Sequence, residues 1–264
     1  MRRTILTALV FFVLPFASCG GGSSNSGASN NNSNPPSPAS TPGQAQGVYD
    51  GTASTGADFE SIVLPTDNLY AIYGSVSNNV FLVCGLITGQ GASASGSFTG
   101  NVTDYDDCTG SLVVSTGSVS ASYVAGSSLN GSLTENGNSY TFTGTTPANS
   151  LFDFNQAAAI SDISGDWSGA VFGGESVTVT IGSDGSVSGF GSSGCSFSGT
   201  VTADSSGKNF FNVSLTYGAA PCTFPNQTGS GIAVDYLLSD GVTRQLIAAV
   251  TLNSSAGTVF FAQR

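Results

Sequence analysis

Residues 177–187 read Val-Thr-Val-Thr-Ile-Gly-Ser-Asp-Gly-Ser-Val. Apolar residues alternate with Thr or Ser on both sides of Asp184-Gly185, and this pattern predicts two antiparallel strands joined by a tight turn. The same alternation recurs at residues 119–123, 129–133, 140–142, 211–217, 232–236 and 246–252. Strands are therefore expected almost throughout from residue 47 onward. Only residues 151–163 are typical of a helix, and that helix would have one or two turns.

About eight short strands fit into each half of this region. Those of the second half are expected near residues 165–172, 175–182, 186–192, 195–204, 208–217, 226–238, 242–252 and 257–263. Eight antiparallel strands can close into an up-and-down barrel, which leaves no exposed sheet edge. A two-sheet sandwich fits nearly as well, but glycines within the strands favour the barrel because tight coiling needs backbone without side chains. The predicted fold class is all-β, with two tandem small antiparallel β-barrel-like domains after a disordered tether.

Two copies of one plan divide the region into domains at 47–146 and 165–264, with a linker at 147–164 that contains the short helix. Residues 47–52 (Gly-Val-Tyr-Asp-Gly-Thr) parallel residues 165–170 (Gly-Asp-Trp-Ser-Gly-Ala). Two further pairs of blocks are similar: residues 88–91 resemble residues 188–191, and residues 97–100 resemble residues 196–199. The two sets have different spacing, which requires an insertion between them. A tandem repeat is the simplest interpretation.

The N-terminus has the organisation of an export signal. Arg2 and Arg3 precede an apolar run, residues 4–16, that is too short for a permanent membrane span, and small Ala17-Ser18 lead to Cys19. This stretch resembles the cleavage box of bacterial lipoproteins, although Phe16 stands where Leu is usual. The resemblance implies a signal peptide at 1–18 and lipidation of Cys19. The alternative is an ordinary secretory signal with an incidental cysteine.

Residues 19–46 comprise Cys19 and a low-complexity tether rich in Gly, Ser, Asn and Pro. The segment after Cys19 has no aromatic and no large aliphatic residue, so it cannot bury enough apolar surface to offset its chain entropy. We expect it to be disordered and to hold the folded part away from the membrane. An alternative role is as an acceptor of O-linked sugars at Ser37, Ser40 and Thr41.

The chain has five cysteines. If Cys19 carries lipid, the other four divide by position into Cys84 with Cys108 and Cys195 with Cys222, one pair in each half. Two disulfides would place the protein in an oxidising compartment. Four reduced, buried thiols are the alternative.

Most of the chain resembles a group of proteobacterial lipoproteins that have a cleaved signal, a tether and two Gly/Ser/Thr-rich β domains. The matching blocks are residues 49–52, the strand at 62–64 that leads through Asp67 to Tyr70, and residues 193–200 and 217–222. This group has no assigned biochemical function. Gly20 after the cysteine resembles lipoproteins sent to the outer membrane. The resemblance therefore implies a lipid-anchored protein of the bacterial cell envelope, at the outer membrane.

Composition excludes several kinds of chemistry. The chain has sixteen acidic residues and no histidine, and removal of the signal leaves only Lys208, Arg244 and Arg264 as cations. Such an anionic surface does not favour nucleic acid, and Ser-His or Cys-His catalysis is excluded. The densest acidic cluster, at residues 104–107, is expected to be a solvated turn; calcium binding is the alternative. We predict no catalytic residue, no metal site and no cofactor.

The remaining hypotheses concern binding. The first is a non-enzymatic, lipid-anchored envelope protein whose two β domains bind a partner or serve a structural role. The second is a carrier of a small lipophilic ligand inside a barrel. Nine aromatic residues could line such a cavity or simply fill the core: Tyr49, Tyr70, Tyr73, Phe81, Trp167, Phe172, Phe190, Phe210 and Phe211. The third is a carboxylate-based hydrolase, which would need a close Asp/Glu pair that the sequence does not reveal. The only partner that we predict is the membrane, through the lipid anchor. The sequence does not identify a protein partner or a small-molecule ligand.

Overall fold

The structure is a computed structural model that describes residues 44–78, 80–148 and 150–264. The predicted signal peptide, Cys19 and nearly all of the tether lie outside the described residues. Among those that are described, no helix combines the length and the apolar character needed to cross a membrane.

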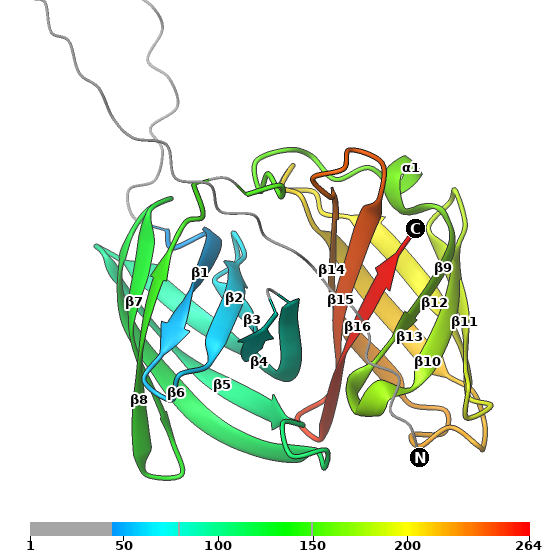
Figure 1. Ribbon diagram of the computed structural model, residues 1–264, viewed down its shortest axis with the longest axis horizontal. Helices are drawn as coiled ribbons and strands as arrows, with labels where there is room; N and C mark the ends of the chain where they lie inside the picture. The colour runs from blue at the N-terminus through cyan, green and yellow to red at the C-terminus, as the bar shows by residue number, and fades with distance from the viewer. Residues whose placement is uncertain (1–43, 79, 149) are drawn as a thin grey trace, which may run out of the picture.

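Two closed eight-stranded antiparallel barrels follow one another along the chain (Figure 1). The first consists of β1 (Gly47–Ala53), β2 (Asp58–Val63), β3 (Asn68–Ser77), β4 (Val80–Ala94), β5 (Ser97–Asp106), β6 (Val113–Val124), β7 (Ser128–Glu135) and β8 (Asn138–Thr145). The second consists of β9 (Gly165–Ala170), β10 (Ser176–Ile181), β11 (Ser186–Gly191), β12 (Ser196–Ala203), β13 (Phe211–Tyr217), β14 (Thr228–Leu237), β15 (Arg244–Leu252) and β16 (Ala256–Gln263). Each strand pairs with the next, and the first strand of each barrel closes onto the last.

This architecture confirms the predicted fold class and decides for barrels over sandwiches. The hairpin predicted from residues 177–187 is β10–β11, in which Ile181 lies opposite Val187. Gly185 in its turn has φ of 81°, a left-handed conformation that suits glycine. The helix predicted over 151–163 is limited to α1 (Ile160–Ile163), while Phe172–Gly174 form a short 3-10 turn, η1. The preceding segment forms turns because Phe152 and Phe154 pack between the barrels rather than along one helix face.

The opening blocks of the predicted repeat occupy equivalent strands in the two barrels, but the later blocks do not. The 47–52 block lies on β1 and the 165–170 block on β9, the first strands of their barrels. Residues 88–91 and 97–100 lie on the fourth and fifth strands, whereas 188–191 and 196–199 lie on the third and fourth. The second alignment is therefore wrong by one strand, because strands built from Gly, Ser and Thr resemble one another wherever they lie.

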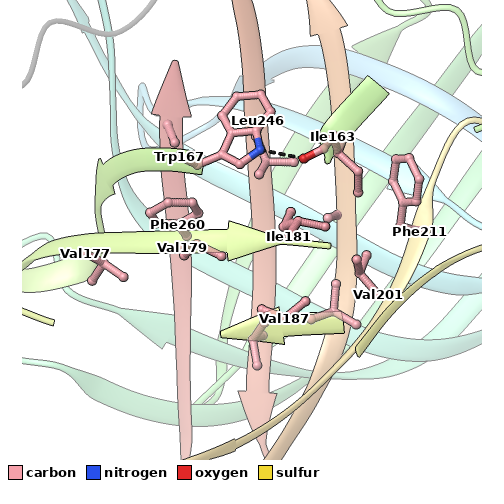
Figure 2. Close-up of a cluster of buried hydrophobic side chains, with 14 residues drawn as sticks. Ile163, Trp167, Val177, Val179, Ile181, Val187, Val201, Phe211, Leu246 and Phe260 are labelled. Atoms are coloured by element: carbon pink, nitrogen blue, oxygen red, sulfur yellow. Dashed lines mark hydrogen bonds between the residues drawn. The ribbon is translucent and has the colours of Figure 1, made fainter. Parts of the chain in front are cut away.

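An aromatic residue closes one end of each barrel in the same way. The Tyr49 hydroxyl donates a hydrogen bond to the carbonyl of Ala45 (2.8 Å), and Trp167 Nε1 donates to the carbonyl of Ile163 (2.7 Å; Figure 2). Both bonds reach back four residues, and Ala45 and Ile163 are fully buried. The segment that precedes the first strand thus plugs each barrel at the end where the chain enters.

The two barrels pack side by side through strands that are apolar on both faces (Figure 1). Along β15, Leu246 and Val250 point into the second barrel, while Ile247 and Ala249 between them join a cluster with residues of β3, β4 and β5. The Tyr105 hydroxyl of β5 donates to the carbonyl of Asn253 in the second barrel (3.0 Å). A Cβ at Gly257 would lie 2.8 Å from the Tyr105 ring, so glycine allows this close approach.

A candidate ligand-binding cavity in the first barrel

The first barrel encloses a cavity of about 670 Å³. It lies at the end that carries the β1–β2 and β7–β8 turns, the lower end in Figure 1 and opposite to the end plugged by Ala45. The second barrel holds about 230 Å³ in its interior, and a cleft between the barrels about 110 Å³. Binding sites for small molecules usually measure about 300–1,000 Å³, so only the first of these three spaces has the usual size.

Side-chain size explains why one barrel is hollow and the other is filled. In the second barrel, the inward positions are occupied by a continuous cluster of Val, Ile, Leu, Phe and Trp side chains (Figure 2). In the first barrel, a comparable cluster around Tyr49, Phe98 and Tyr123 fills the plugged end only. Toward the other end several of the lining positions carry small side chains, among them Ala53, Ala71 and Gly74. Small inward residues leave the lumen open.

A polar group forms one wall of this cavity. Tyr73 of β3, Asp104 of β5 and Glu135 at the end of β7 all line it. The Tyr73 hydroxyl donates to both oxygens of Asp104, at 2.9 and 3.2 Å. Gly85 lies opposite Tyr73 on β4, and a Cβ there would come within 1.9 Å of the Tyr73 ring. Glycine at 85 therefore makes the room in which the ring lies flat against the strand.

Burial raises the pKa of the Asp104 carboxyl to about 7. The charges of Glu135 and Asp106 and a hydrogen bond with Glu135 act in the same direction, while the hydrogen bond from Tyr73 opposes them. The pKa of Glu135 is raised as well, chiefly by burial, and the pKa of Tyr73 is raised by burial and by the charge of Asp104. Near neutral pH, this carboxyl pair can therefore either hold a proton or interact with a cation.

Aromatic rings form much of the remaining wall. Phe59 and Phe142 meet edge to face, with ring centroids 5.9 Å apart and planes at 86°, and Tyr140 lines the same cavity. The disulfide between Cys84 and Cys108 lies at the mouth and joins β4 to the loop after β5. In the second barrel, Cys195 in the turn before β12 is bonded to Cys222 in the loop after β13. Both pairings are those expected from the sequence.

The cleft between the barrels holds a second pair of acidic residues. Asp50 of β1 and Glu60 of β2 are direct cross-strand partners, and both line this cleft. Burial raises the pKa of Asp50 to about 6; burial and the charge of Asp50 raise the pKa of Glu60 to about 7. The Tyr236 ring of β14 lines the same cleft, and burial together with these two carboxylates raises its pKa. The cleft itself is too small for most organic ligands.

Comparison with known proteins identifies no family. No family model matches the chain, and no curated protein matches it. Among solved structures, a protein of unknown function from the DUF3598 family of Nostoc punctiforme is 12% identical, with a TM-score of 0.26, over 83% of this chain and 94% of that one. The isotype 1 transferrin binding protein B of Neisseria meningitidis is 11% identical, with a TM-score of 0.23, over 79% of this chain and 65% of that one. Scores this low carry no argument about function.

The nine aromatic residues singled out in the sequence are mostly not at the cavity. Tyr73 lines it; Tyr49, Trp167 and Phe211 fill the barrel cores, and Phe190 is exposed. The other four, Tyr70, Phe81, Phe172 and Phe210, pack between the barrels. The other rings that line the cavity, those of Phe59, Tyr140 and Phe142, were not among these nine.

The acidic cluster at 104–107 is not the solvated turn that we expected. Asp104 and Asp106 both line the cavity, and Asp104 is buried there, whereas Asp107 accepts the Gly173 N–H of the second barrel (2.9 Å). The period of two along β5 places Asp104 and Asp106 on its inner face, and Asp107 follows the end of the strand. Within the described residues, no three His, Cys, Asp or Glu side chains are arranged to hold a metal ion.

Proposed function

We propose that this protein is a lipid-anchored binding protein of the bacterial envelope that holds a small molecule inside its first barrel. The cavity of about 670 Å³ is the observation that carries the proposal. Its apolar walls and its few convergent polar groups are typical of binding sites for small molecules. The second barrel, with its filled core, then serves as a rigid partner against which the first is packed.

Binding is a better interpretation of the Asp104–Glu135 pair than hydrolysis. Glycosidases hold their two carboxyl groups about 5 Å apart or more, so that a sugar carbon, with or without a water molecule, fits between them. Here Glu135 lies close enough to Asp104 for its charge to raise the pKa of the Asp104 carboxyl, and both side chains line the same wall. They form one polar point in the wall rather than two faces of a catalytic cleft.

Filling the cavity is expected to abolish retention of a ligand. Ala71 of β3 points into the cavity, and Ala71→Phe would place a ring there. Ala92→Phe adds the same ring at an exposed position of β4 and serves as the control. The chain from residue 20 onward would be exported to a bacterial periplasm and examined by native and denaturing mass spectrometry. Wild type and Ala92→Phe should carry an adduct that denaturation releases, and Ala71→Phe should carry none.

Two results would contradict this function. An adduct that persists in folded Ala71→Phe would place the ligand elsewhere. A wild-type protein that carries no adduct, and that binds neither octyltrimethylammonium nor n-octanol nor octyl sulfate, would remove the support for a carrier. Circular dichroism of each variant establishes that it is folded before its spectrum is interpreted.

Lipid anchoring is tested separately. Cys19→Ser is expected to incorporate no labelled palmitate and to leave the membrane fraction, because the serine hydroxyl does not replace the acylated thiol. Ser23→Ala, an equally small change in the tether, should label and fractionate like wild type. Palmitate incorporation into Cys19→Ser, or its unchanged recovery with membranes, would contradict the proposed anchor.

A further inference from the structure

We propose that the ligand of the first barrel is an organic cation, with an amine or quaternary ammonium head group and an apolar body. The proposal rests on the function proposed above, and it concerns the chemistry of the ligand. Its basis is the combination of carboxyl groups that have no basic side chain beside them and aromatic rings around one cavity.

The cavity is anionic and has no cation of its own. Three carboxyl groups line it, those of Asp104, Asp106 and Glu135. Between residues 4 and 207 the sequence contains no Lys, Arg or His, so the first barrel has no basic side chain. An anionic wall without an internal counter-ion attracts a positively charged group from solution.

The three cations of the described chain are engaged elsewhere, all in the second half. Lys208 Nζ donates to Asn155 Oδ1 (2.8 Å). Arg244 pairs with Asp235, and Arg264 donates to the carbonyl of Ser164 (2.6 Å). None of them lines the cavity.

Asp104 is the group for which a cation matters most. It is 9% exposed, and its hydrogen-bond donor is an uncharged phenol, that of Tyr73. Burying a carboxylate costs free energy unless a positive charge is close to it. Here burial raises the pKa of the Asp104 carboxyl to about 7. A bound ammonium group would supply the missing charge in place of the proton.

The aromatic walls favour an organic cation over a metal ion. The faces of Phe and Tyr rings attract cations, and cages of such rings are used to bind quaternary ammonium groups. Four rings line this cavity, those of Phe59, Tyr73, Tyr140 and Phe142. A divalent metal ion would instead require several oxygen ligands around one point, and none of the described residues form such a set. The volume of the cavity also leaves room for an apolar body beyond the head group.

The second barrel shows that these features are specific to the first. Its smaller interior is lined by a single carboxylate, Glu175, which accepts hydrogen bonds from the hydroxyl and the backbone N–H of Ser193, at 2.6 and 3.0 Å. One carboxylate in a filled interior gives the second barrel neither the charge nor the space of the first.

The test compares three probes that share one alkyl chain and differ in the head group: octyltrimethylammonium, n-octanol and octyl sulfate. Binding to the chain from residue 20 onward would be measured by isothermal titration calorimetry at about pH 8, where the carboxyl groups are mostly ionised. We expect octyltrimethylammonium to bind at least about tenfold more tightly than n-octanol. Octyl sulfate should not bind.

Asp104→Asn and Glu135→Gln keep the shape of the wall and remove its charge. Each is expected to weaken octyltrimethylammonium about tenfold and to leave n-octanol unchanged. Asp58→Asn is the matched control, since Asp58 lies on β2 next to Phe59 but on the opposite face of the strand. It should bind all three probes like wild type.

Each other outcome has a definite meaning. If n-octanol binds as tightly as octyltrimethylammonium, or if octyl sulfate binds more tightly, the cation proposal is overturned while a small-molecule cavity remains. If calcium or magnesium competes with octyltrimethylammonium at equal concentration, the site is a metal site and the proposal is wrong. If no probe binds and no adduct is retained, the proposed function fails together with this inference.

Discussion

Replacing Trp167 with alanine is expected to lower the free energy of unfolding by about 3 to 5 kcal/mol, the usual cost of removing a buried Trp or Phe side chain. Trp167 is 1% exposed and lies at the plugged end of the second barrel (Figure 2). Its indole N–H holds the carbonyl of Ile163 at 2.7 Å, and the Arg264 guanidinium lies 4.2 Å from the ring centre. The substitution therefore removes packing, a buried hydrogen bond and a cation–π contact together.

Urea denaturation followed by circular dichroism measures this effect, since the chain has only one Trp and its fluorescence is lost in the variant. Trp167→Phe keeps a ring but leaves the Ile163 carbonyl without its donor, and should cost less than the alanine variant. Tyr49→Phe makes the equivalent change in the first barrel, at a cost of about 1 kcal/mol. Phe190→Ala is the control: its side chain is 54% exposed, so the effect should be below about 1 kcal/mol. A Trp167→Ala protein as stable as this control would contradict the role of the aromatic plug.

The protein is expected to be more stable at about pH 5 than at about pH 8, by about 2 to 4 kcal/mol. Burial raises the pKa of Asp50 to about 6 and those of Glu60 and Asp104 to about 7. Between the usual carboxyl pKa and these values the folded state binds more protons than the unfolded state, so stability falls as the pH rises through this window. Asp184 and Asp240, whose pKa values are lowered by hydrogen bonds from Ser186 and Thr243, have the opposite effect only at more acidic pH.

Urea midpoints measured at several pH values test this dependence. Glu60→Gln and Asp104→Asn should each flatten the slope between about pH 5 and pH 8 and raise stability at the alkaline end, because a neutral amide costs less to bury than a carboxylate. Asp58→Asn, at an outward position of the same strand as Glu60, should keep the wild-type slope. Stability that rises from about pH 5 to pH 8 would show that these carboxyl groups are hydrated in solution.

The candidate site was partly accessible from the sequence. Alternation along residues 98–106 places Phe98, Val102 and Asp104 on one face of a strand, so a carboxyl group on the inner face of a barrel could have been anticipated. That Tyr73 and Glu135 meet Asp104 could not, because the three lie on alternate strands whose relative shift is set by closure of the barrel. The Asp50–Glu60 pair was hidden for a related reason: its environment is created by the second barrel, which is distant in the chain.

By itself, the sequence determined what depends on neighbouring residues. The period of two, the turn residues and the placing of the cysteines predicted strands, hairpins and the two disulfides, since each follows from local geometry or from short chain separations. Only the tertiary structure decided that both sheets close, that one lumen is filled and the other hollow, and which carboxyl groups are buried. Those properties depend on the sizes and charges of side chains that come together from up to eight strands, and a local sequence pattern does not specify which side chains meet.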